Sequence, residues 1–151
     1  MIRPAQPADR AAVEAVVEAA YSVYVARIGK KPGPMLDDYG RLIGGGAVSV
    51  FAETDGAVAG ILVLLPKPDH LLLDNIAVCP ERQGRGIGRA LIAFAESEAR
   101  RRGYREIRLY THEKMTENIA LYQRLGFVEA GRGHEAGYDR VFMRKPIADC
   151  P

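Results

Sequence analysis

The sequence has few of the residues that mark several common classes of protein. Its 151 residues include two cysteines, three histidines and no tryptophan. Cys79 and Cys150 lie far apart and form no CxxC pair, so we expect neither a disulfide scaffold nor a structural zinc site. The longest apolar run, Ile61 to Leu65, is too short to span a bilayer, and the first residues contain no apolar segment of signal-peptide length. We therefore expect a cytoplasmic protein with no metal site and no membrane association.

An excess of one charge is also missing from the chain as a whole. The 21 basic and 19 acidic residues give a formal net charge of +2, which is too close to neutral to indicate a dedicated nucleic-acid-binding protein. The imbalance is local, because residues 81–108 contain eight arginines against four glutamates. Arg100-Arg101-Arg102 has no interleaved aromatic residues, so a solvated helix end explains it better than nucleic-acid binding. We expect any anionic ligand to bind within residues 81–108.

Hydrophobic periodicity predicts one α/β domain over residues 1–151, in the order β-α-α-β-β-β-α-β-α-β-β. The expected helices begin near Asp9 and Thr116, each acting as an N-cap, and also cover 36–43 and 86–102. Strands are expected at 48–52, 57–65, 71–78, 107–111, 127–130 and 140–144. Asp55-Gly56 predicts a two-residue hairpin turn. The strand–helix–strand unit from 71 to 111 predicts a parallel pair, and the hairpin makes the remaining sheet antiparallel.

One glycine-rich segment indicates a binding function. Gln83-Gly84-Arg85-Gly86-Ile87-Gly88-Arg89 lies between a predicted strand and a long predicted helix. Alternating glycines leave the first amides of that helix accessible, which favours a phosphate or pyrophosphate. The spacing excludes two well-known phosphate loops, because there is no GxxxxGK[ST] motif and the glycines read GxGxG instead of GxGxxG.

The Gln-x-x-Gly-x-Gly pattern of Gln83, Gly86 and Gly88 resembles that of the GNAT superfamily of acetyl-coenzyme A-dependent N-acetyltransferases. Asn75-Ile-Ala-Val-Cys-Pro80 resembles the family's core strand, and Asn118 to Phe127 resembles the following helix and strand. The resemblance covers roughly residues 47 to 145. It implies a GNAT-like acyl-CoA acyltransferase fold, with a mostly antiparallel central sheet, one splayed parallel strand pair and helices on both faces.

The resemblance also implies roles for particular residues. The cofactor-binding set would comprise Ile76, Ala77, Val78, Gln83, Gly84, Arg85, Gly86, Ile87, Gly88, Arg89, Asn118 and Tyr122. Within it, the backbone of residues 76–78 would pair with the pantetheine arm and the amides of residues 84–89 would hold the pyrophosphate. Asn118 would contact the same arm. Tyr122, one turn further along the helix, would protonate the departing thiolate.

The general base is less well specified, because leucines occupy positions 71–73, where many family members have a glutamate. Asp74 is the first candidate, Glu113 the second, and a water chain without a dedicated base is the third. The acceptor pocket is expected to be formed by residues of the first helices and the loop between them, together with Glu113: Tyr24, Arg27, Met35 and Tyr39.

These observations predict transfer of an acetyl group from acetyl-coenzyme A to a primary amine of a small molecule or peptide, by direct attack in a ternary complex. One alternative is an acyl-coenzyme A-binding regulatory module without catalysis. Another is a weak nucleic-acid-binding protein that uses the arginine-rich face. A homodimer is a further expectation, since Val141 to Met143 could pair with the same strand of a second copy.

Overall fold

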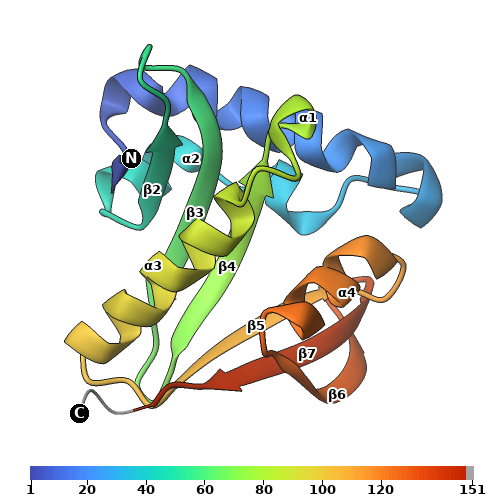
Figure 1. The fold of residues 1–151 in the computed structure, drawn as a ribbon. Coiled ribbons are helices and arrows are strands. Elements are labelled where there is room, and N and C mark those ends of the chain that lie inside the picture. The colour runs from blue at the N-terminus through green and yellow to red at the C-terminus, as the bar shows by residue number, and fades with distance from the viewer. Residues whose placement is uncertain (149–151) are drawn as a thin grey trace.

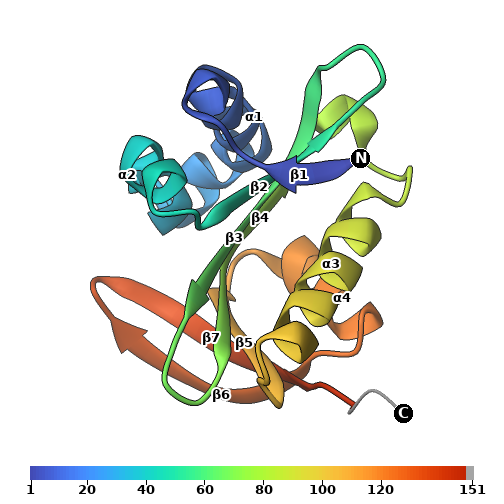
Figure 2. The same cartoon turned by 90° about the vertical axis from the view of Figure 1, so that its left-hand side faces the viewer.

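The computed structural model describes residues 1–148, which form a seven-stranded mixed sheet with helices on both faces (Figures 1 and 2). The strands are β1 (Ile2–Pro4), β2 (Val48–Ala52), β3 (Val58–Pro66), β4 (Leu71–Val78), β5 (Glu106–His112), β6 (Val128–Glu135) and β7 (Tyr138–Pro146). The α-helices are α1 (Arg10–Ile28), α2 (Tyr39–Gly44), α3 (Ile87–Arg101) and α4 (Thr116–Arg124). Short 3₁₀ turns are η1 (Pro7–Asp9), η2 (Gly33–Leu36) and η3 (Pro80–Arg82).

The strand order is β1-β2-β3-β4-β5-β7-β6. Within residues 1–148, β4 and β5 form the one parallel pair, and every other neighbouring pair is antiparallel. The mixed sheet and its parallel pair therefore confirm the fold class predicted from the sequence.

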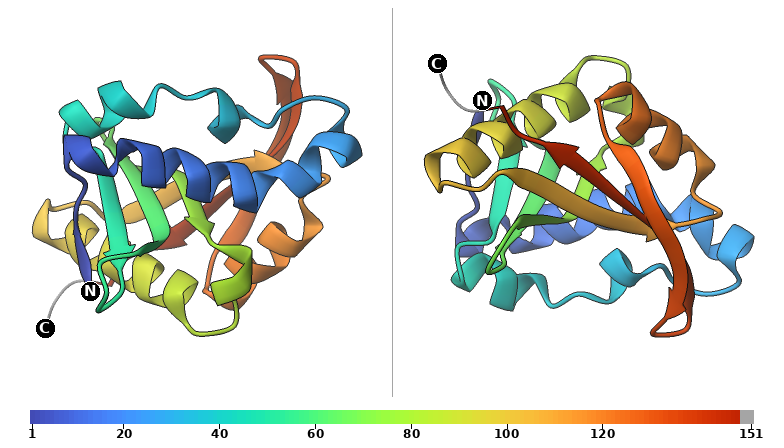
Figure 3. Two further views of the ribbon diagram at one scale, coloured as in Figure 1. Left: turned by 90° about the horizontal axis from the view of Figure 1, so that it is seen from above. Right: turned by 90° about the horizontal axis from the view of Figure 1, so that it is seen from below.

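Two hydrophobic clusters hold the helices to the sheet. Helices α1 and α2 cover one face, where Val13, Val17 and Ile61 are fully or almost fully buried. Helices α3 and α4 cover the other face, where Leu91 and Phe127 are equally buried (Figure 3). The i, i+3, i+4 spacing of apolar residues in α1 and α3 produces these two buried stripes.

The splayed geometry of the sheet originates in an irregularity of β4. Val63 of β3 pairs with Asn75 and Leu64 pairs with Leu73, so Asp74 is an extra residue without a partner on β3. Such a bulge reverses which face the following side chains occupy. Leu73 accordingly packs in the α3 cluster, whereas Asn75 bonds to Tyr21 of α1.

Beyond this bulge β4 and β5 separate, as Figure 1 shows. Their register is limited to Leu71 opposite Ile107 and Leu72 opposite Arg108. In the described part of the chain, no strand pairs with the β5-facing edge of β4 from residue 73 to residue 78. The fold therefore leaves an open backbone edge in the middle of the sheet.

Three local predictions were wrong in detail. Asp9 precedes α1, but its carboxylate accepts hydrogen bonds from the Gln6 amide (2.7 Å) and from Arg3 instead of capping α1. Thr116 is the first residue of α4, and Met115 occupies the N-cap position without a side-chain bond. The β2–β3 hairpin has a three-residue loop, residues 54–56, because the Glu53 amide donates to the Ala57 carbonyl and glycine 56 adopts a left-handed conformation.

The predicted dimer contact through Val141 to Met143 was also wrong as a strand pairing. Strand β7 lies between β5 and β6, so its backbone groups are used on both sides. Val141 and Met143 are themselves buried. Separately, none of the helices within residues 1–148 is sufficiently long and apolar to cross a membrane.

Candidate active site

The glycine-rich segment forms the N-terminal end of α3. Gly84 and Gly86 have φ angles of +83° and +81°, a conformation that favours glycine, and a Cβ at either position would project into open space. Within residues 1–148, no backbone carbonyl accepts a hydrogen bond from the amides of residues 84–89, and the first such bond joins the Ala90 amide to the Gly86 carbonyl. Free amides at the positive end of a helix dipole fit a phosphate or pyrophosphate group.

The arginines of residues 81–108 are mostly neutralised by acidic neighbours. Arg82 pairs with Glu53 at 3.0 Å, and Arg101 and Arg102 both pair with Glu98. In the part of the chain that the structure describes, neither Arg85 nor Arg89 forms an ion pair. The local positive charge predicted from the sequence is therefore available at the glycine-rich loop.

The open edge of β4 leads from this loop into the sheet. The Cys79 amide donates to the Ala59 carbonyl of β3, so Cys79 and Ala59 form a hydrogen-bonded pair. Such pairs recur at every second residue of an antiparallel ladder. Ala77, opposite Ile61, is therefore the next residue whose backbone groups face β3. The backbone groups of Ile76 and Val78 therefore face the opening between β4 and β5. This corrects the expectation for Ala77, whose amide and carbonyl are not on the open edge.

Side chains hold that edge in position. The Gln83 side-chain amide donates to the Val78 carbonyl at 3.4 Å, which joins the loop to the end of β4. Tyr21 of α1 lies 2.6 Å from Asn75 Oδ1 and 2.9 Å from the Ile76 carbonyl, its hydroxyl acting as donor. Asn75 in turn donates to the Tyr39 hydroxyl at 2.7 Å. A buried polar network therefore couples the open strand to both helices of one face.

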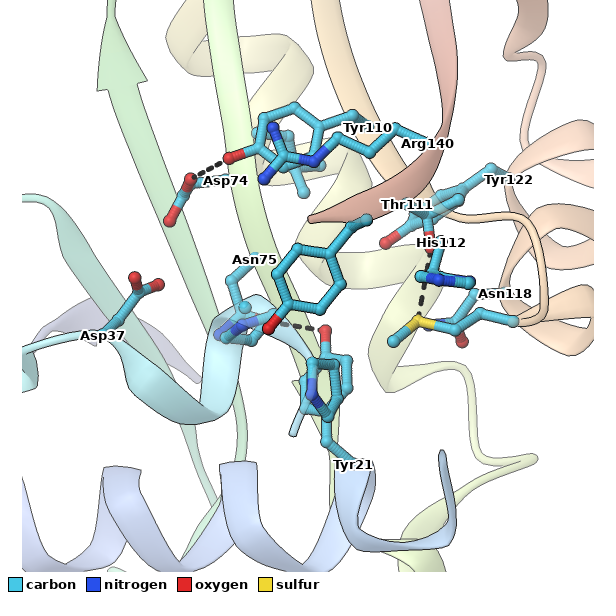
Figure 4. A pocket seen from close by; sticks show the side chains of 16 residues that line it. Tyr21, Asp37, Asp74, Asn75, Tyr110, Thr111, His112, Asn118, Tyr122 and Arg140 are labelled. Carbon is cyan, nitrogen blue, oxygen red and sulfur yellow. Dashed lines mark hydrogen bonds between the residues drawn. The ribbon is translucent and has the colours of Figure 1, made fainter. Parts of the chain in front are cut away.

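A cavity of about 150 Å³ lies where β4 and β5 separate (Figure 4). Its lining residues come from α1, the segment before α2, β4, β5, α4 and β7: Tyr21, Pro32, Gly33, Pro34, Asp37, Leu73, Asp74, Asn75, Tyr110, Thr111, His112, Met115, Asn118, Tyr122, Tyr138 and Arg140. The cavity therefore contains Asp74, Asn118 and Tyr122, three residues that the sequence motifs singled out.

Tyr122 contributes an unpartnered hydroxyl to this cavity. The side chain is 4% exposed, and its ring packs edge-on against Phe127 with the ring centroids 5.8 Å apart. Among residues 1–148 its hydroxyl forms no hydrogen bond, and it opens onto the cavity instead of being enclosed. Burial of the side chain raises the pKa of the phenol above its usual value. Tyr122 therefore keeps its proton at neutral pH and can donate it to a ligand. Asn118, one turn earlier on α4, lies 3.8 Å from the Met115 sulfur.

The bulge directs Asp74 toward the opening, where a second carboxyl group joins it. Asp37 comes from the segment before α2 and lines the same cavity as Asp74. Partial desolvation at the cavity and the charge of Asp74 raise the pKa of Asp37 to about 7. Tyr110 of β5 donates to Asp74 through a long contact of 3.5 Å. The motifs did not indicate Asp37, since a single aspartate in an irregular segment has no distinctive spacing.

His112 and Arg140 also line the cavity. Nδ1 of His112 accepts a hydrogen bond from the Lys114 amide at 3.1 Å, so Nε2 carries the proton of the neutral ring. Burial lowers the pKa of His112, which favours that neutral form. Arg140 lies 4.1 Å above the ring of Tyr110 and forms an ion pair with Glu135.

The residues predicted to line the acceptor pocket lie beside this cavity instead of on its surface. Tyr39 is buried behind Asn75, and Met35 packs against the α1 cluster. Tyr24 donates to Glu117 at 3.2 Å, and Arg27 pairs with the same carboxylate at 2.7 Å. Glu113 and Arg27 line a separate, shallow surface hollow near α4. The segment between α1 and α2 does reach the cavity, through its two prolines, Gly33 and Asp37.

Comparison with known proteins gives a consistent result. The family model described as "Acetyltransferase (GNAT) family" matches residues 13–127. N-acetyltransferase family 8 member 3 of Rattus norvegicus is 36% identical over 86 residues, which are 53% of this chain and 38% of that protein. The [ribosomal protein bS18]-alanine N-acetyltransferase of Salmonella typhimurium is 34% identical over 103 residues, 62% of this chain and 68% of that protein. The matched region spans about half the length of the Escherichia coli relative of the same name.

Solved structures share the fold over almost the whole chain. A GNAT-family acetyltransferase from Desulfovibrio desulfuricans superposes with a TM-score of 0.79 at 26% identity, covering 98% of this chain and 99% of that one. The PaiA N-acetyltransferase from Thermoplasma acidophilum, solved with coenzyme A, gives a TM-score of 0.78 at 20% identity, covering 97% and 98% of the two chains.

Proposed function

The chain belongs to the acetyltransferase (GNAT) family, and on this basis we propose that it transfers the acetyl group of acetyl-coenzyme A to a primary amine, by direct attack in a ternary complex. The observation that carries the proposal is the open edge of β4. It runs from the free amides of residues 84–89 to the cavity that contains the unpartnered Tyr122 hydroxyl. A phosphate-binding end, an extended edge and a proton donor thus lie in the order that a long thioester ligand requires.

The residues present fit acetyl-coenzyme A, which supplies an activated acetyl thioester when it is bound. The amides of residues 84–89, with Arg85 and Arg89, would hold the pyrophosphate. The backbone groups of Ile76 and Val78 would hydrogen-bond to the pantetheine arm as a neighbouring strand does. Asn118 lines the same cavity and has no strong hydrogen bond to relinquish, since its one contact is to a sulfur.

An acceptor amine has to lose protons before and after it attacks. An alkylammonium group has a pKa of about 10.4, so almost all of it is protonated at neutral pH. Asp74 takes one proton from the ammonium nitrogen, whose lone pair then forms the new nitrogen–carbon bond while the carbon–sulfur bond breaks. The nitrogen then releases a second proton to solvent. Tyr122 donates its phenolic proton to the sulfur and regains one from solvent, so one proton is released overall.

Two observations support Asp74 as the base over Glu113. Asp74 lines the cavity at the point where β4 and β5 separate, whereas Glu113 lies outside it and 3.9 Å from Arg132. A carboxylate at the opening also favours an enzyme over a non-catalytic acyl-coenzyme A-binding module, which needs no base. The hydroxyl of Tyr122 supports catalysis in the same way.

The acceptor is an amine of a small molecule or of a peptide. The name of the Salmonella relative specifies an alanine of ribosomal protein bS18, which makes a peptide amine one of the two classes. The cavity walls contain both acidic and aromatic side chains, which suit an ammonium group in either class.

Calorimetric titration of the purified protein with acetyl-coenzyme A tests the proposal, with coenzyme A and NAD as comparison ligands. We expect saturable binding of acetyl-coenzyme A and coenzyme A, and none of NAD. Screening amines by thiol release then tests turnover. Absence of acetyl-coenzyme A binding at low salt would refute the proposed function, and binding without thiol release from any amine would leave the non-catalytic module as the better description.

A further inference from the structure

Two adjacent carboxyl groups at the cavity have no positively charged partner. Within residues 1–148, neither Asp37 nor Asp74 takes part in an ion pair, and the one hydrogen bond donated to either is the 3.5 Å contact from Tyr110. Carboxyl groups that face each other without a cation between them repel when both are ionised. A ligand that brings positive charge between the two carboxyl groups would relieve this repulsion.

The cation on the cavity wall is engaged elsewhere. Arg140 forms an ion pair with Glu135 and lies over the face of the Tyr110 ring. It therefore neutralises neither aspartate by direct contact, and its own charge is already balanced. The part of the cavity beside β4 is consequently acidic, although the loop that precedes α3 is basic.

A separate observation indicates a ligand in the same cavity. Tyr122 is 4% exposed, and its hydroxyl, which opens onto the cavity, forms no hydrogen bond in the described chain. Figure 4 shows Tyr122 and the two aspartates on opposite sides of the cavity. A ligand that contacts both must carry positive charge at one end and meet a proton donor at the other.

We propose that Asp37 and Asp74 together bind the acceptor amine as a cation, an inference that rests on the proposed acetyl transfer. Asp37 thereby selects aliphatic amines that carry no carboxylate of their own, such as linear diamines. Asp37 acts by contact with the ammonium end of the acceptor before proton transfer. An amino acid brings a carboxylate that the pair repels, since Arg140 has no free charge to offset it.

Cadaverine and lysine form a matched pair of acceptors, because they differ by the α-carboxylate alone. We expect the wild-type protein to use cadaverine with a kcat/KM at least about tenfold above that for lysine. Asp37→Asn should reduce that ratio severalfold, whereas Asp37→Glu, which keeps the charge, should retain most of it. Cadaverine titrated calorimetrically into the coenzyme A complex should bind about tenfold more weakly to Asp37→Asn than to the wild type.

Asp38→Asn is the matched control. The neighbouring Asp38 caps α2 through the Arg41 amide and lies outside the cavity, and asparagine can make the same cap. The ratio of kcat/KM for cadaverine to kcat/KM for lysine should therefore stay at its wild-type value in Asp38→Asn. A folded Asp37→Asn protein with an unchanged ratio, or a wild type that prefers lysine, would overturn the inference. Loss of acetyl-coenzyme A binding by the wild type would instead refute the proposed function.

Discussion

Replacing Tyr122 with phenylalanine separates a catalytic hydroxyl from a structural one. The hydroxyl opens onto the cavity and forms no hydrogen bond within residues 1–148, so its removal breaks none in the folded protein. Phenylalanine preserves the ring that packs against Phe127. We therefore expect the free energy of unfolding to change by no more than about 0.5 kcal/mol, while kcat falls by about 10²- to 10⁴-fold through loss of a general acid.

Tyr21→Phe provides the structural comparison. That hydroxyl contacts Asn75 at 2.6 Å and the Ile76 carbonyl at 2.9 Å, both buried, so removing it leaves acceptors unsatisfied. We expect it to lower the free energy of unfolding by about 1–3 kcal/mol. Urea titration measures stability, and initial rates of thiol release with saturating acetyl-coenzyme A and a fixed amine measure kcat.

The reasoning about Tyr122 fails if Tyr122→Phe keeps wild-type kcat across the pH range in which the protein is folded. It fails equally if this variant is destabilised as much as Tyr21→Phe, since the hydroxyl would then be structural. A selective loss of acetyl-coenzyme A affinity with unchanged kcat would assign Tyr122 to binding instead of proton transfer.

Gly86→Glu should abolish acetyl-coenzyme A binding in calorimetric titration, because it adds a carboxylate beside the free amides. Gly46→Glu is the control, since Gly46 has a similar φ of +76° but lies far from those amides. This variant should suffer the same backbone strain and still bind acetyl-coenzyme A. The raised pKa of Asp37, about 7, means that the folded chain binds a proton that the unfolded chain releases between about pH 4 and pH 7. The folded state therefore loses stability as pH rises through that range, and the melting temperature of Asp37→Asn should increase relative to wild type from pH 5 to pH 8. The difference in melting temperature between Asp37→Asn and wild type should therefore change with pH. A difference that is constant with pH, or equal to the difference for Asp38→Asn, would contradict the raised pKa of Asp37.

The glycine-rich loop shows how far sequence reasoning extends when a function depends on local backbone geometry. Gly84 and Gly86 adopt positive φ angles where the motif places them, and the amides of residues 84–89 are free as predicted. Both properties follow from short-range rules, namely the conformational freedom of glycine and the unpaired amides at any helix start. Asn118 and Tyr122 likewise share one cavity because a helix places residues four apart on one face.

The hairpin and strand predictions show where local rules become insufficient. The expected edge contact at Val141 to Met143 failed because the order of β7 and β6 in the sheet depends on pairing with β5, which is distant in sequence. The loops of the sheet and the cap at Thr116 differ by one residue from expectation, within the range over which neighbouring conformations have similar energies.

The sequence by itself determined the class of fold, the glycine-rich loop with its free amides and the helix that contributes Tyr122, because each depends on residues within a few positions of one another. The tertiary structure alone decided which carboxylates reach the cavity. The register between β3 and β4 makes Asp74 the extra residue of a bulge, and the packing of α1 and α2 on the sheet brings Asp37 to the same cavity. Asp37 and β4 are far apart in the chain, whereas β3 and β4 are consecutive strands. No local spacing specifies either arrangement, since strand register is set by the combined burial of both faces.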